Sequence, residues 1–520
     1  MATWDELRAE LEVRLAAARA MGGPERIARE RERGKSTARE RVDMLLDAGS
    51  FDEWGAFAHH QEQSPDMVNR STPSDGLVCG QGRIGGRLVC VAADDATVMG
   101  GSRGLAAEAK QSHLRRAAIG SGVPFIWLQE ASGGRIQELM GASFAARTFA
   151  TNFSDQVQRM SGWIPQVSAL LGACFGQPAF VSGLAEFVPM SNLASVGASG
   201  PPVVAAAIGE RSSEQELGGP QIALAQGLVD GVYAGDKAVM DAIRAYLGYF
   251  PSNSGSSPPI VASSDPVDRQ CPELESIVPT NLRQPYDMRK VIKAVCDADS
   301  EFFEIGEGNG PQMIVGYARI GGISIGIVAN QPKVQAGVIS ATAARKASRF
   351  IQVCDAFHIP LVFLVDTPGF MVGAKAEREG LAAGAARMLS AILEATVPTL
   401  TVILRKSYGL GFFAMNGACM SPDTLLTWPT ASISQMGPEP AVNVIHAKQI
   451  QAAADPDALR AELVEQLRQD IARPYKAAGT GAIDNVIDPR ATRAMLARRL
   501  VALTQRPASA IVFKRRIPPR

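Results

Sequence analysis

Two glycine-bearing loops have the residue types best suited to chemistry in this sequence. Each follows a strand expected to be buried: 165–172 leads into the loop 173–179, and 398–406 leads into the loop 407–413. Glycine lets the backbone turn so that amide groups point at a ligand oxygen. Two amides directed at one oxygen form an oxyanion hole, which stabilises developing negative charge. From the residues alone, a tight turn with no catalytic role is an equally good interpretation.

Two other motifs compete with these loops. Gly100-Gly101-Ser102-Arg103-Gly104 matches the serine hydrolase elbow G-x-S-x-G, with a helix expected after it. A triad also needs a histidine in a later loop, and only His446 is suitably placed, so a hydrolase is the minor alternative. The run 80–85 matches the dinucleotide fingerprint, but a strand rather than a helix should follow it, which predicts a hairpin turn.

The elements that position these loops are duplicated. The run 80–101 is similar to 316–337, and 123–134 is similar to 359–370; both pairs are 236 positions apart. An unchanged separation across both blocks indicates one repeated unit without insertions. Each copy has a Gly-Gly turn between two strands, then an alanine-rich basic helix, then another strand.

This strand–helix–strand order predicts an α/β fold with right-handed parallel crossovers. Ligand-binding loops in such folds lie at the carboxyl ends of the strands, which here are the loops 132–134 and 367–369. A Ser- and Pro-rich segment, 251–275, has the composition of a linker. We therefore predict an N-terminal domain at 1–258, a linker at 259–275 and a C-terminal domain at 276–520.

Composition excludes several classes of protein. Lys plus Arg and Asp plus Glu each number 52, so the net charge is zero, which argues against a protein that coats nucleic acid. The seven cysteines lack zinc-site spacing, and we expect no metal. We find neither a signal peptide nor a run of about 18 apolar residues, so we expect a cytoplasmic protein with no membrane span.

Many further motifs resemble those of a single family. They include GKSTARERVDMLLDAGSFDEW at 34–54, GIVANQPKV at 326–334, ARKASRFIQVCDAFHIPLVFLVDTPGF at 344–370, RKSYG at 405–409 and WPTASISQMG at 428–437. In order and content they resemble the carboxyltransferase subunits of propionyl-CoA, acetyl-CoA and methylcrotonyl-CoA carboxylases, and related decarboxylase subunits. The resemblance runs from about residue 33 to 450 and beyond.

The resemblance implies an architecture and partners. It implies two crotonase-like (ClpP/crotonase) domains of ββα repeats in tandem, and a homo-hexamer that is a trimer of dimers. Each active site would lie between the N-terminal domain of one protomer and the C-terminal domain of its dimer partner. The implied cofactor is biotin, present as carboxybiotin on a separate carrier subunit. A biotin carboxylase is the implied partner, because this chain has no Met-Lys-Met acceptor and no recognisable ATP-binding domain.

The implied activity is transfer of a carboxyl group from carboxybiotin to the α (or vinylogous) carbon of an acyl-CoA thioester. Two oxyanion holes would stabilise charge on the thioester oxygen and on the biotin ureido oxygen. Carried over by motif, the catalytic amides are those of Gly176, Gln177, Leu410 and Gly411. The implied substrate-binding residues are Ser132, Gly133, Gly134, Phe412 and Phe413.

This sequence departs from the family at both holes. The run 175–178 replaces Ala-Gly-Gly-Ala, and the run 408–413 replaces Tyr-Gly-Gly-Ala-Tyr-Asp. Backbone donors survive added side chains, but Pro178 has no N–H. The acyl group stays open, and so do two alternatives: a decarboxylase subunit running the reverse half-reaction, and a non-catalytic scaffold or regulatory paralogue.

Overall fold

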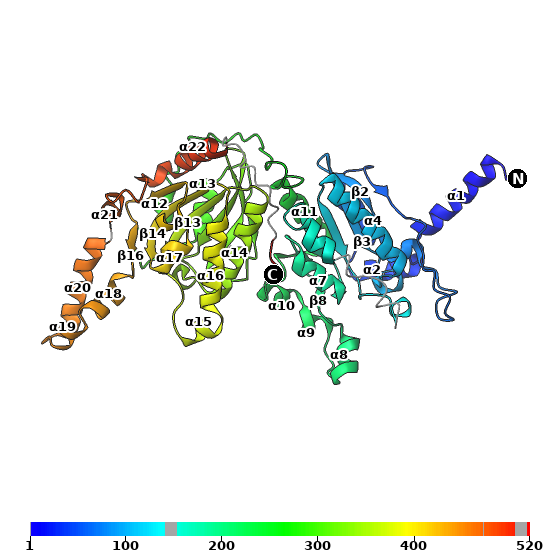
Figure 1. Ribbon diagram of the computed structural model, residues 1–520, viewed down its shortest axis with the longest axis horizontal. Coiled ribbons are helices and arrows are strands. Elements are labelled where there is room, and N and C mark those ends of the chain that lie inside the picture. The colour runs from blue at the N-terminus through cyan, green and yellow to red at the C-terminus, as the bar shows by residue number, and fades with distance from the viewer. Residues whose placement is uncertain (1, 141–152, 472, 505–516) are drawn as a thin grey trace. The chain divides into compact units, whose positions relative to one another are not determined.

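The computed structural model describes residues 2–140, 153–471, 473–504 and 517–520, which divide into two units (Figure 1). The described residues before Ser257, together with 517–520, form unit 1, and those from Ser257 to the end of the last helix form unit 2. Residues 259–275, the linker predicted from composition, cluster with unit 2. Cys271 and Leu274 of this segment are buried in its core.

Unit 1 is built on a seven-stranded sheet of order β1-β2-β3-β4-β5-β7-β9. Its strands are β1 (Asp52–Glu53), β2 (Leu77–Ile84), β3 (Arg87–Asp94), β4 (Phe125–Gln129), β5 (Gln166–Leu170), β7 (Pro189–Ser191) and β9 (Gly231–Tyr233). A separate two-stranded sheet pairs β6 (Ala173–Phe175) with β8 (Ser195–Gly197). The helices are α1 (Trp4–Arg19), α2 (Pro24–Glu32), α3 (Ala38–Leu45), α4 (Leu105–Ser121), α7 (Gln177–Leu184), α8 (Pro201–Ile208), α9 (Glu214–Gly218), α10 (Pro220–Ala225) and α11 (Gly235–Gly248).

Unit 2 has a sheet of order β10-β11-β12-β13-β14-β15-β17, with β16 paired to the end of β14. Its strands are β10 (Phe303–Ile305), β11 (Met313–Ile320), β12 (Ile323–Asn330), β13 (Leu361–Thr367), β14 (Thr399–Tyr408), β15 (Thr424–Thr427), β16 (Ser432–Ser434) and β17 (Asn485–Val486). Its helices are α12 (Leu274–Ile277), α13 (Met288–Val295), α14 (Ala341–Ala356), α15 (Ala374–Arg378), α16 (Leu381–Glu394), α17 (Leu410–Ala414), α18 (Pro438–Ile445), α19 (Ala447–Gln451), α20 (Pro456–Ile471), α21 (Tyr475–Ala478) and α22 (Thr492–Thr504).

The predicted duplication is confirmed strand by strand. The bounds of β11 and β12 are each 236 positions after those of β2 and β3, and both pairs are antiparallel hairpins. The parallel strands β4 and β13 then follow the helices α4 and α14. The run 80–85 therefore lies in a hairpin, as predicted, rather than in a nucleotide-binding turn.

The hairpin turns are stabilised in the same way in both units. The Asp47 carboxylate accepts hydrogen bonds from the amides of Gly85 and Gly86 at 3.0 and 2.8 Å. In unit 2, Asp297 accepts from Gly321 and Gly322, both at 2.8 Å. Each carboxylate accepts hydrogen bonds from two turn amides that have no backbone partner. These bonds stabilise the hairpin that precedes the crossover helix in each unit.

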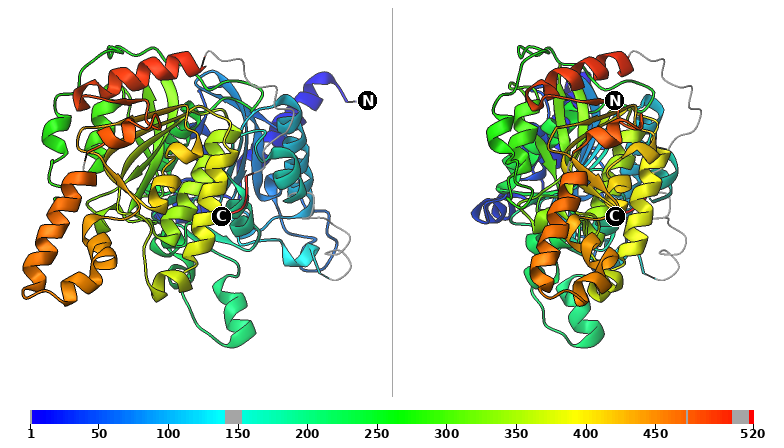
Figure 2. Two further views of the ribbon diagram at one scale, coloured as in Figure 1. Left: turned by 60° about the vertical axis from the view of Figure 1, so that its left-hand side comes forward. Right: turned by 90° about the vertical axis from the view of Figure 1, so that its left-hand side faces the viewer.

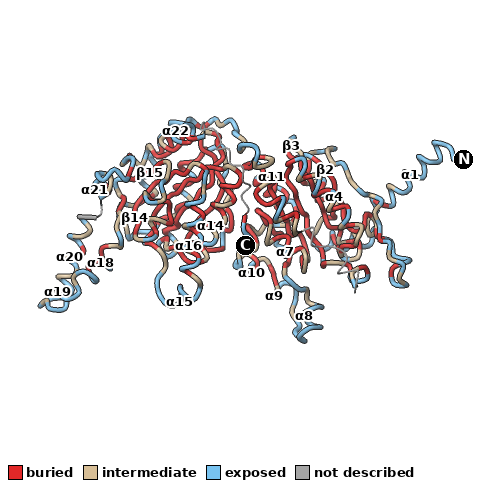
Figure 3. The backbone as a smooth tube through the Cα atoms, viewed as in Figure 1, coloured by how far each residue is buried: buried red, intermediate tan, exposed pale blue. Residues whose placement is uncertain are grey.

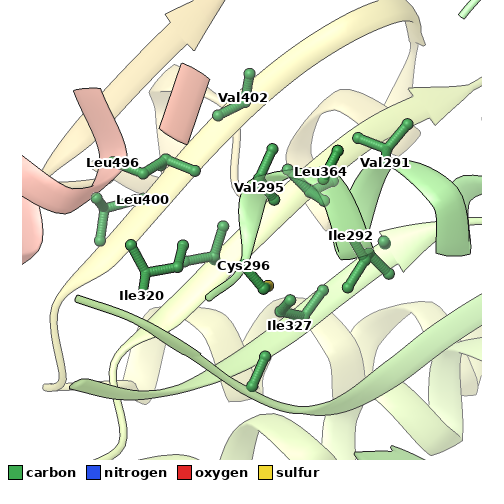
Figure 4. Close-up of a cluster of buried hydrophobic side chains, with 14 of the residues drawn as sticks. Val291, Ile292, Val295, Cys296, Ile320, Ile327, Leu364, Leu400, Val402 and Leu496 are labelled. Carbon is green, nitrogen blue, oxygen red and sulfur yellow. The ribbon is translucent and has the colours of Figure 1, made fainter. Parts of the chain in front are cut away.

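The main core of unit 2 lies between the sheet and two helices. Figure 4 shows Val295 of α13 and Leu496 of α22 in one cluster with Leu400 and Val402 of β14 and Leu364 of β13. On the other side, α14 and α16 lie side by side, and the ring of Phe350 in α14 is 5.0 Å from that of Tyr317 in β11. Packing both faces explains why β11 to β14 are continuously buried (Figure 3).

A few helices lie outside these cores. Figure 3 shows α1, α8 and α19 mostly in the colour of exposed residues, and Figure 2 shows them projecting from their units. None of the helices in the described ranges is long and apolar enough to cross a membrane.

Candidate active site

The two predicted loops each turn at a glycine and then begin a helix. Gly176 precedes α7 with φ +78° and ψ −125°, and Gly409 precedes α17 with φ +55° and ψ −138°. Residues with a Cβ are strained in this region, so the turn depends on glycine. The first amides of a helix have no acceptor within the helix and are left to bind something else.

Hydrogen bonds show which predicted donors are already used. The amide of Gly176 donates to the carbonyl oxygen of Gly197 at 2.9 Å, because the loop continues the pairing of β6 with β8. Gly409 donates to Ser434 at 2.9 Å in the same manner. Gly176 is thus committed to the backbone in this structure. The sequence could not show this, because its acceptor lies on a strand from elsewhere in the chain.

The amides of Gln177, Leu410 and Gly411 stay available. Within the described part of the chain, none of these three N–H groups has a hydrogen-bond acceptor. Counted from the turning glycine, Gln177 is equivalent to Leu410, and Pro178 is equivalent to Gly411. Since proline has no N–H, unit 1 offers one amide at its helix start and unit 2 offers two.

A second glycine loop contacts each helix start. In unit 1 it is the predicted loop 132–134, where a Cβ on Gly176 would lie 4.0 Å from the Cα of Gly133. In unit 2 it is the loop after β13, where a Cβ on Gly411 would lie 2.7 Å from the Cα of Gly369. Each unit therefore brings its predicted rim loop, 132–134 or 367–369, against its candidate oxyanion-hole loop, 173–179 or 407–413.

A buried polar cluster, not predicted from the sequence, supports the loops of unit 1. Arg103 is 2% exposed, and its guanidinium donates to the Asp94 carboxylate at 3.0 and 2.9 Å. It also donates to Oε1 of Gln177 at 3.5 Å, while its backbone amide donates to the carbonyl of Gly133 at 2.9 Å. Burial by itself would lower the pKa of Arg103, but the neighbouring Asp94 carboxylate raises it by more, so the pKa of Arg103 is raised overall. Arg103 stays charged and ties the loop 132–134 to the start of α7.

The Gln177 side chain adds a donor to this site. Its Nε2 is buried and has no acceptor among the described residues. In unit 2 the equivalent residue is Leu410, which is 57% exposed. The positions equivalent to Asp94 and Arg103 are Asn330 and Ile339, so unit 2 lacks the ion pair. The two loops are similar in backbone but differ in polarity, because only unit 1 has an ion pair at the position of Asp94 and Arg103.

Phe412 and Phe413 lie on α17, directly after the two available amides. Both side chains are partly buried, and their ring centroids are 5.9 Å apart at an angle of 59°. They present an apolar surface next to polar backbone donors, which is the combination expected of a site for a small organic substrate.

A carboxylate at the end of the central strand anchors each loop system. Glu130, after β4, pairs with Lys35 and Arg41, both at 2.6 Å. Asp366 lies 236 positions later, in β13, and pairs with the adjacent residues Arg405 and Lys406 at 2.7 and 3.1 Å. The position of the carboxylate is duplicated, although its cations come from different segments.

Other chemistries find little support. The Ser102 hydroxyl donates to the carbonyl of Met99 at 2.9 Å, and His113 packs beside Trp54 rather than near that serine. Burial raises the pKa of the Cys174 thiol to about 12, so it is a poor nucleophile. No group of three His, Cys, Asp or Glu side chains arranged for a metal occurs in the residues that the structure describes.

Comparison with known proteins identifies the family. Residues 29–517 match the carboxyl transferase domain. The chain belongs to the carboxyl transferase family. It is 39% identical over 501 residues to the propionyl-CoA carboxylase carboxyltransferase subunit of Haloferax mediterranei, covering 96% of this chain and 94% of the relative. It is 38% identical to the methylmalonyl-CoA decarboxylase subunit alpha of Veillonella parvula, covering 97% of both chains.

A solved structure extends the likeness to the fold. The crystal structure of the transcarboxylase 12S hexamer with methylmalonyl-coenzyme A bound superposes with a TM-score of 0.91 at 37% identity, covering 99% of both chains. The predicted α/β fold of two crotonase-like halves is confirmed for this carboxyl transferase, as is the prediction that it is an enzyme of that family.

Proposed function

We propose that this chain is the carboxyltransferase subunit of a biotin-dependent acyl-CoA carboxylase. It would move a carboxyl group between biotin and the α (or vinylogous) carbon of an acyl-CoA thioester. The observation that carries the proposal is the pair of equivalent helix starts with available amides, each against a second glycine loop, in a chain of this family.

The reaction needs two positions where oxygen gains negative charge. On the acyl-CoA, loss of the α-proton or of the α-carboxyl group places charge on the thioester oxygen. We assign this oxygen to unit 1, where the amide of Gln177 and the loop 132–134 converge. One well-placed donor is worth a factor of about 10²–10³ in rate. Gly176 is a weaker candidate for the second donor than the sequence indicated, since its amide donates to Gly197.

Unit 2 fits the second oxygen, that of the biotin ureido group. The amides of Leu410 and Gly411 are adjacent and available. Bound carboxybiotin supplies the carboxyl group and, once it has lost that group, a ring nitrogen that can take the proton from the α-carbon. The amides of this chain would hold the ureido oxygen and stabilise its charge during the exchange.

Phe412 and Phe413 bear on the choice of acyl group. The family motif that the run 408–413 resembles ends in Asp at the position of Phe413. Two phenyl rings could fill the pocket and restrict it to the smallest acyl groups, or they could form the wall of a wider apolar pocket. We favour the second alternative, a branched, longer or aromatic acyl chain, because burying each ring against the acyl group would contribute about 1–3 kcal/mol.

We also propose that the enzyme is a homo-hexamer, a trimer of dimers. The equivalent helices α8 and α18 follow β8 and β16 and both expose apolar side chains. These are Val203 at 56% and Ile208 at 72% in α8, and Val444 at 69% and Ile445 at 66% in α18. Exposed apolar surfaces of this kind are typical of protein interfaces. The 12S relative assembles as a hexamer.

The partners proposed are a biotin carboxylase and a biotin carrier on separate chains. The experiment is to co-purify this chain with the carrier and measure bicarbonate fixation over a panel of CoA esters. We expect fixation that depends on biotin, on ATP and on one group of CoA esters. A complex that binds the carrier but fixes no bicarbonate with any ester would instead support the non-catalytic scaffold.

The decarboxylase alternative has its own support. Identity to the decarboxylase subunit is 38%, against 39% for the carboxylase subunit, so the comparisons do not separate the two directions. Co-purification with a membrane-bound decarboxylase subunit instead of a biotin carboxylase would decide for decarboxylation.

A further inference from the structure

A cationic cavity in unit 2 lies at the carboxyl ends of β12 and β13. Its volume is about 490 Å³, and it is lined by residues of the segments 282–285, 332–336 and 405–406 and by Pro368. Four of the lining residues are cationic: Arg283, Lys333, Arg405 and Lys406. The proposed reaction uses none of their charges.

The carboxylates around this cavity do not balance the four cations. Arg405 and Lys406 share the single carboxylate of Asp366, and Arg283 pairs with Glu439 at 2.8 Å. Lys333 has no ion pair among the residues that the structure describes. Four positive charges against two carboxylates leave an excess of two.

One further carboxylate, Asp287, lies near Lys333. It accepts hydrogen bonds from the side chain of Gln331 at 2.7 Å and from the amide of Arg289 at 3.1 Å. Its Coulombic contact with Lys333 helps to lower the pKa of Asp287, after burial, which raises it, and these hydrogen bonds. Asp287 keeps its negative charge, but the guanidinium of Arg289 lies 3.9 Å from it, and Asp287 is not among the residues that line the cavity.

Arg405 provides a second, independent indication of a ligand. Its side chain is fully buried; Nε donates to Asp366, and Nη1 donates to the carbonyl groups of Pro279, Asn281 and Gln284 at 3.1, 2.8 and 3.0 Å. Nη2 is buried and has no acceptor in the described chain. The guanidinium also lies over the ring of Tyr286, 4.7 Å from its centroid, which gives Nη2 no oxygen acceptor. A buried guanidinium donor without an acceptor is unfavourable, and Arg405 is among the residues that line this cavity.

The equivalent place in unit 1 is covered by protein. Thr97, 236 positions before Lys333, accepts the amide of Gly22 at its hydroxyl, at 2.9 Å. Its carbonyl accepts from the Arg26 guanidinium at 3.1 Å, so the chain around the start of α2 occupies this surface. Within the described residues of unit 2, nothing makes the corresponding bonds to Lys333. The duplication therefore shows that this surface can be covered and that unit 2 leaves it open.

We infer that this cavity binds a phosphoryl group. A phosphate ester carries about 1.5–2 negative charges at neutral pH, which matches the excess of two positive charges. Guanidinium and ammonium groups are the side chains that bind phosphate oxygens best. The phosphoryl group could come from a CoA ester or from free phosphate; the chemistry at the cavity is the same, and it does not depend on the proposed carboxyl transfer.

The test is direct binding of pyrophosphate to the full-length protein at low ionic strength, by calorimetry. The variant is Lys333→Glu, because the Lys333 side chain is exposed and makes no hydrogen bond or ion pair with the described residues. Arg405→Lys is unsuitable, because it would remove the bonds that hold the segment 279–284. The control is Lys448→Glu on α19, an exposed lysine of the same unit outside the cavity. We expect Lys333→Glu to raise the Kd at least tenfold and the control to change it less than twofold.

Two further binding measurements distinguish a CoA ester from free phosphate as the source of the phosphoryl group. If CoA supplies the phosphoryl group, Lys333→Glu should weaken binding of CoA but not of pantetheine. If free phosphate is the ligand, the variant should weaken binding of inorganic phosphate and leave CoA binding unchanged. Either result supports the site. Absence of pyrophosphate binding by the wild-type protein, or equal affinity in the wild type and Lys333→Glu, would overturn it.

Discussion

In the proposed biotin site of unit 2, Gly411 is the residue at which an added methyl group should disturb the structure most. A Cβ there would lie 2.7 Å from the Cα of Gly369, so the start of α17 and the neighbouring loop must move apart. A displacement near 1 Å in a catalytic site costs about a hundredfold. We expect Gly411→Ala to lower kcat/KM by about that factor without dissociating the assembly.

The matched control is Gly120→Ala in α4. No atom lies within 4 Å of a Cβ at this position, and alanine is the better helix former. Its kcat/KM should equal that of the wild type. If Gly411→Ala has the same kinetics as this control, the amides of α17 do not take part in turnover.

Phe413 allows the choice of acyl group to be tested at one side chain. Aspartate removes an apolar ring and adds charge, so Phe413→Asp should lose preference for long or aromatic acyl groups relative to acetyl- and propionyl-CoA. The change should be graded, because one methylene in a hydrophobic pocket is worth about 10–200-fold. The measurement is kcat/KM for each ester in both proteins. An unchanged ranking would remove Phe413 from the acyl pocket.

At the scale of elements, a buried ion pair holds the segment before α3 against the end of β4. Glu130 is 5% exposed and accepts from both Lys35 and Arg41. Glu130→Gln would leave two cations with one carboxylate fewer in a buried site, which costs about 3–5 kcal/mol. We expect Glu130→Gln to lower the free energy of unfolding by about this amount. The measurement is urea unfolding, whose midpoint should move to a lower urea concentration.

The control for this prediction is an exposed ion pair of the same unit. Lys237 and Asp241 are 2.6 Å apart on the surface of α11, with side chains 78% and 58% exposed. Asp241→Asn should cost less than about 1 kcal/mol. Equal shifts for the two variants would show that Glu130 does not anchor the loops.

The elements themselves were largely predictable, whereas their polar contacts were not. The hairpins and crossover strands follow from a separation of 236 positions that is visible in the sequence, and the glycines mark the turns. The bond between Gly176 and Gly197, and the pairing of Lys35 with Glu130 across 95 positions, join segments that only the folded chain brings together. No local pattern indicates such contacts, so the sequence could not show that the amide of Gly176 already has an acceptor.

At the scale of the whole molecule, the exposed apolar residues of α8 and α18 favour an interface between copies of the chain. Six copies of a 55.0 kDa chain have a mass of about 330 kDa, which light scattering should find. The double substitution of Val444 and Ile445 by glutamate should lower this mass. Leu393→Glu, at a comparably exposed residue on α16, should not. A wild-type protein of 55 kDa at working concentration would exclude the hexamer.

The central claim is the exchange of a carboxyl group between a CoA ester and biotin, in whichever direction the enzyme runs. It is tested most directly with carboxyl-labelled dicarboxylic acyl-CoA, free biotin and the purified assembly. In each turnover the bond between the α-carbon and the carboxyl group breaks, a ureido nitrogen of biotin loses its proton and gains the carboxyl group, and the α-carbon gains that proton. We predict that label appears in carboxybiotin only when protein and biotin are both present, and about a hundredfold more slowly with Gly411→Ala. A folded hexamer that binds the CoA esters but transfers no label to biotin from any of them would contradict the account.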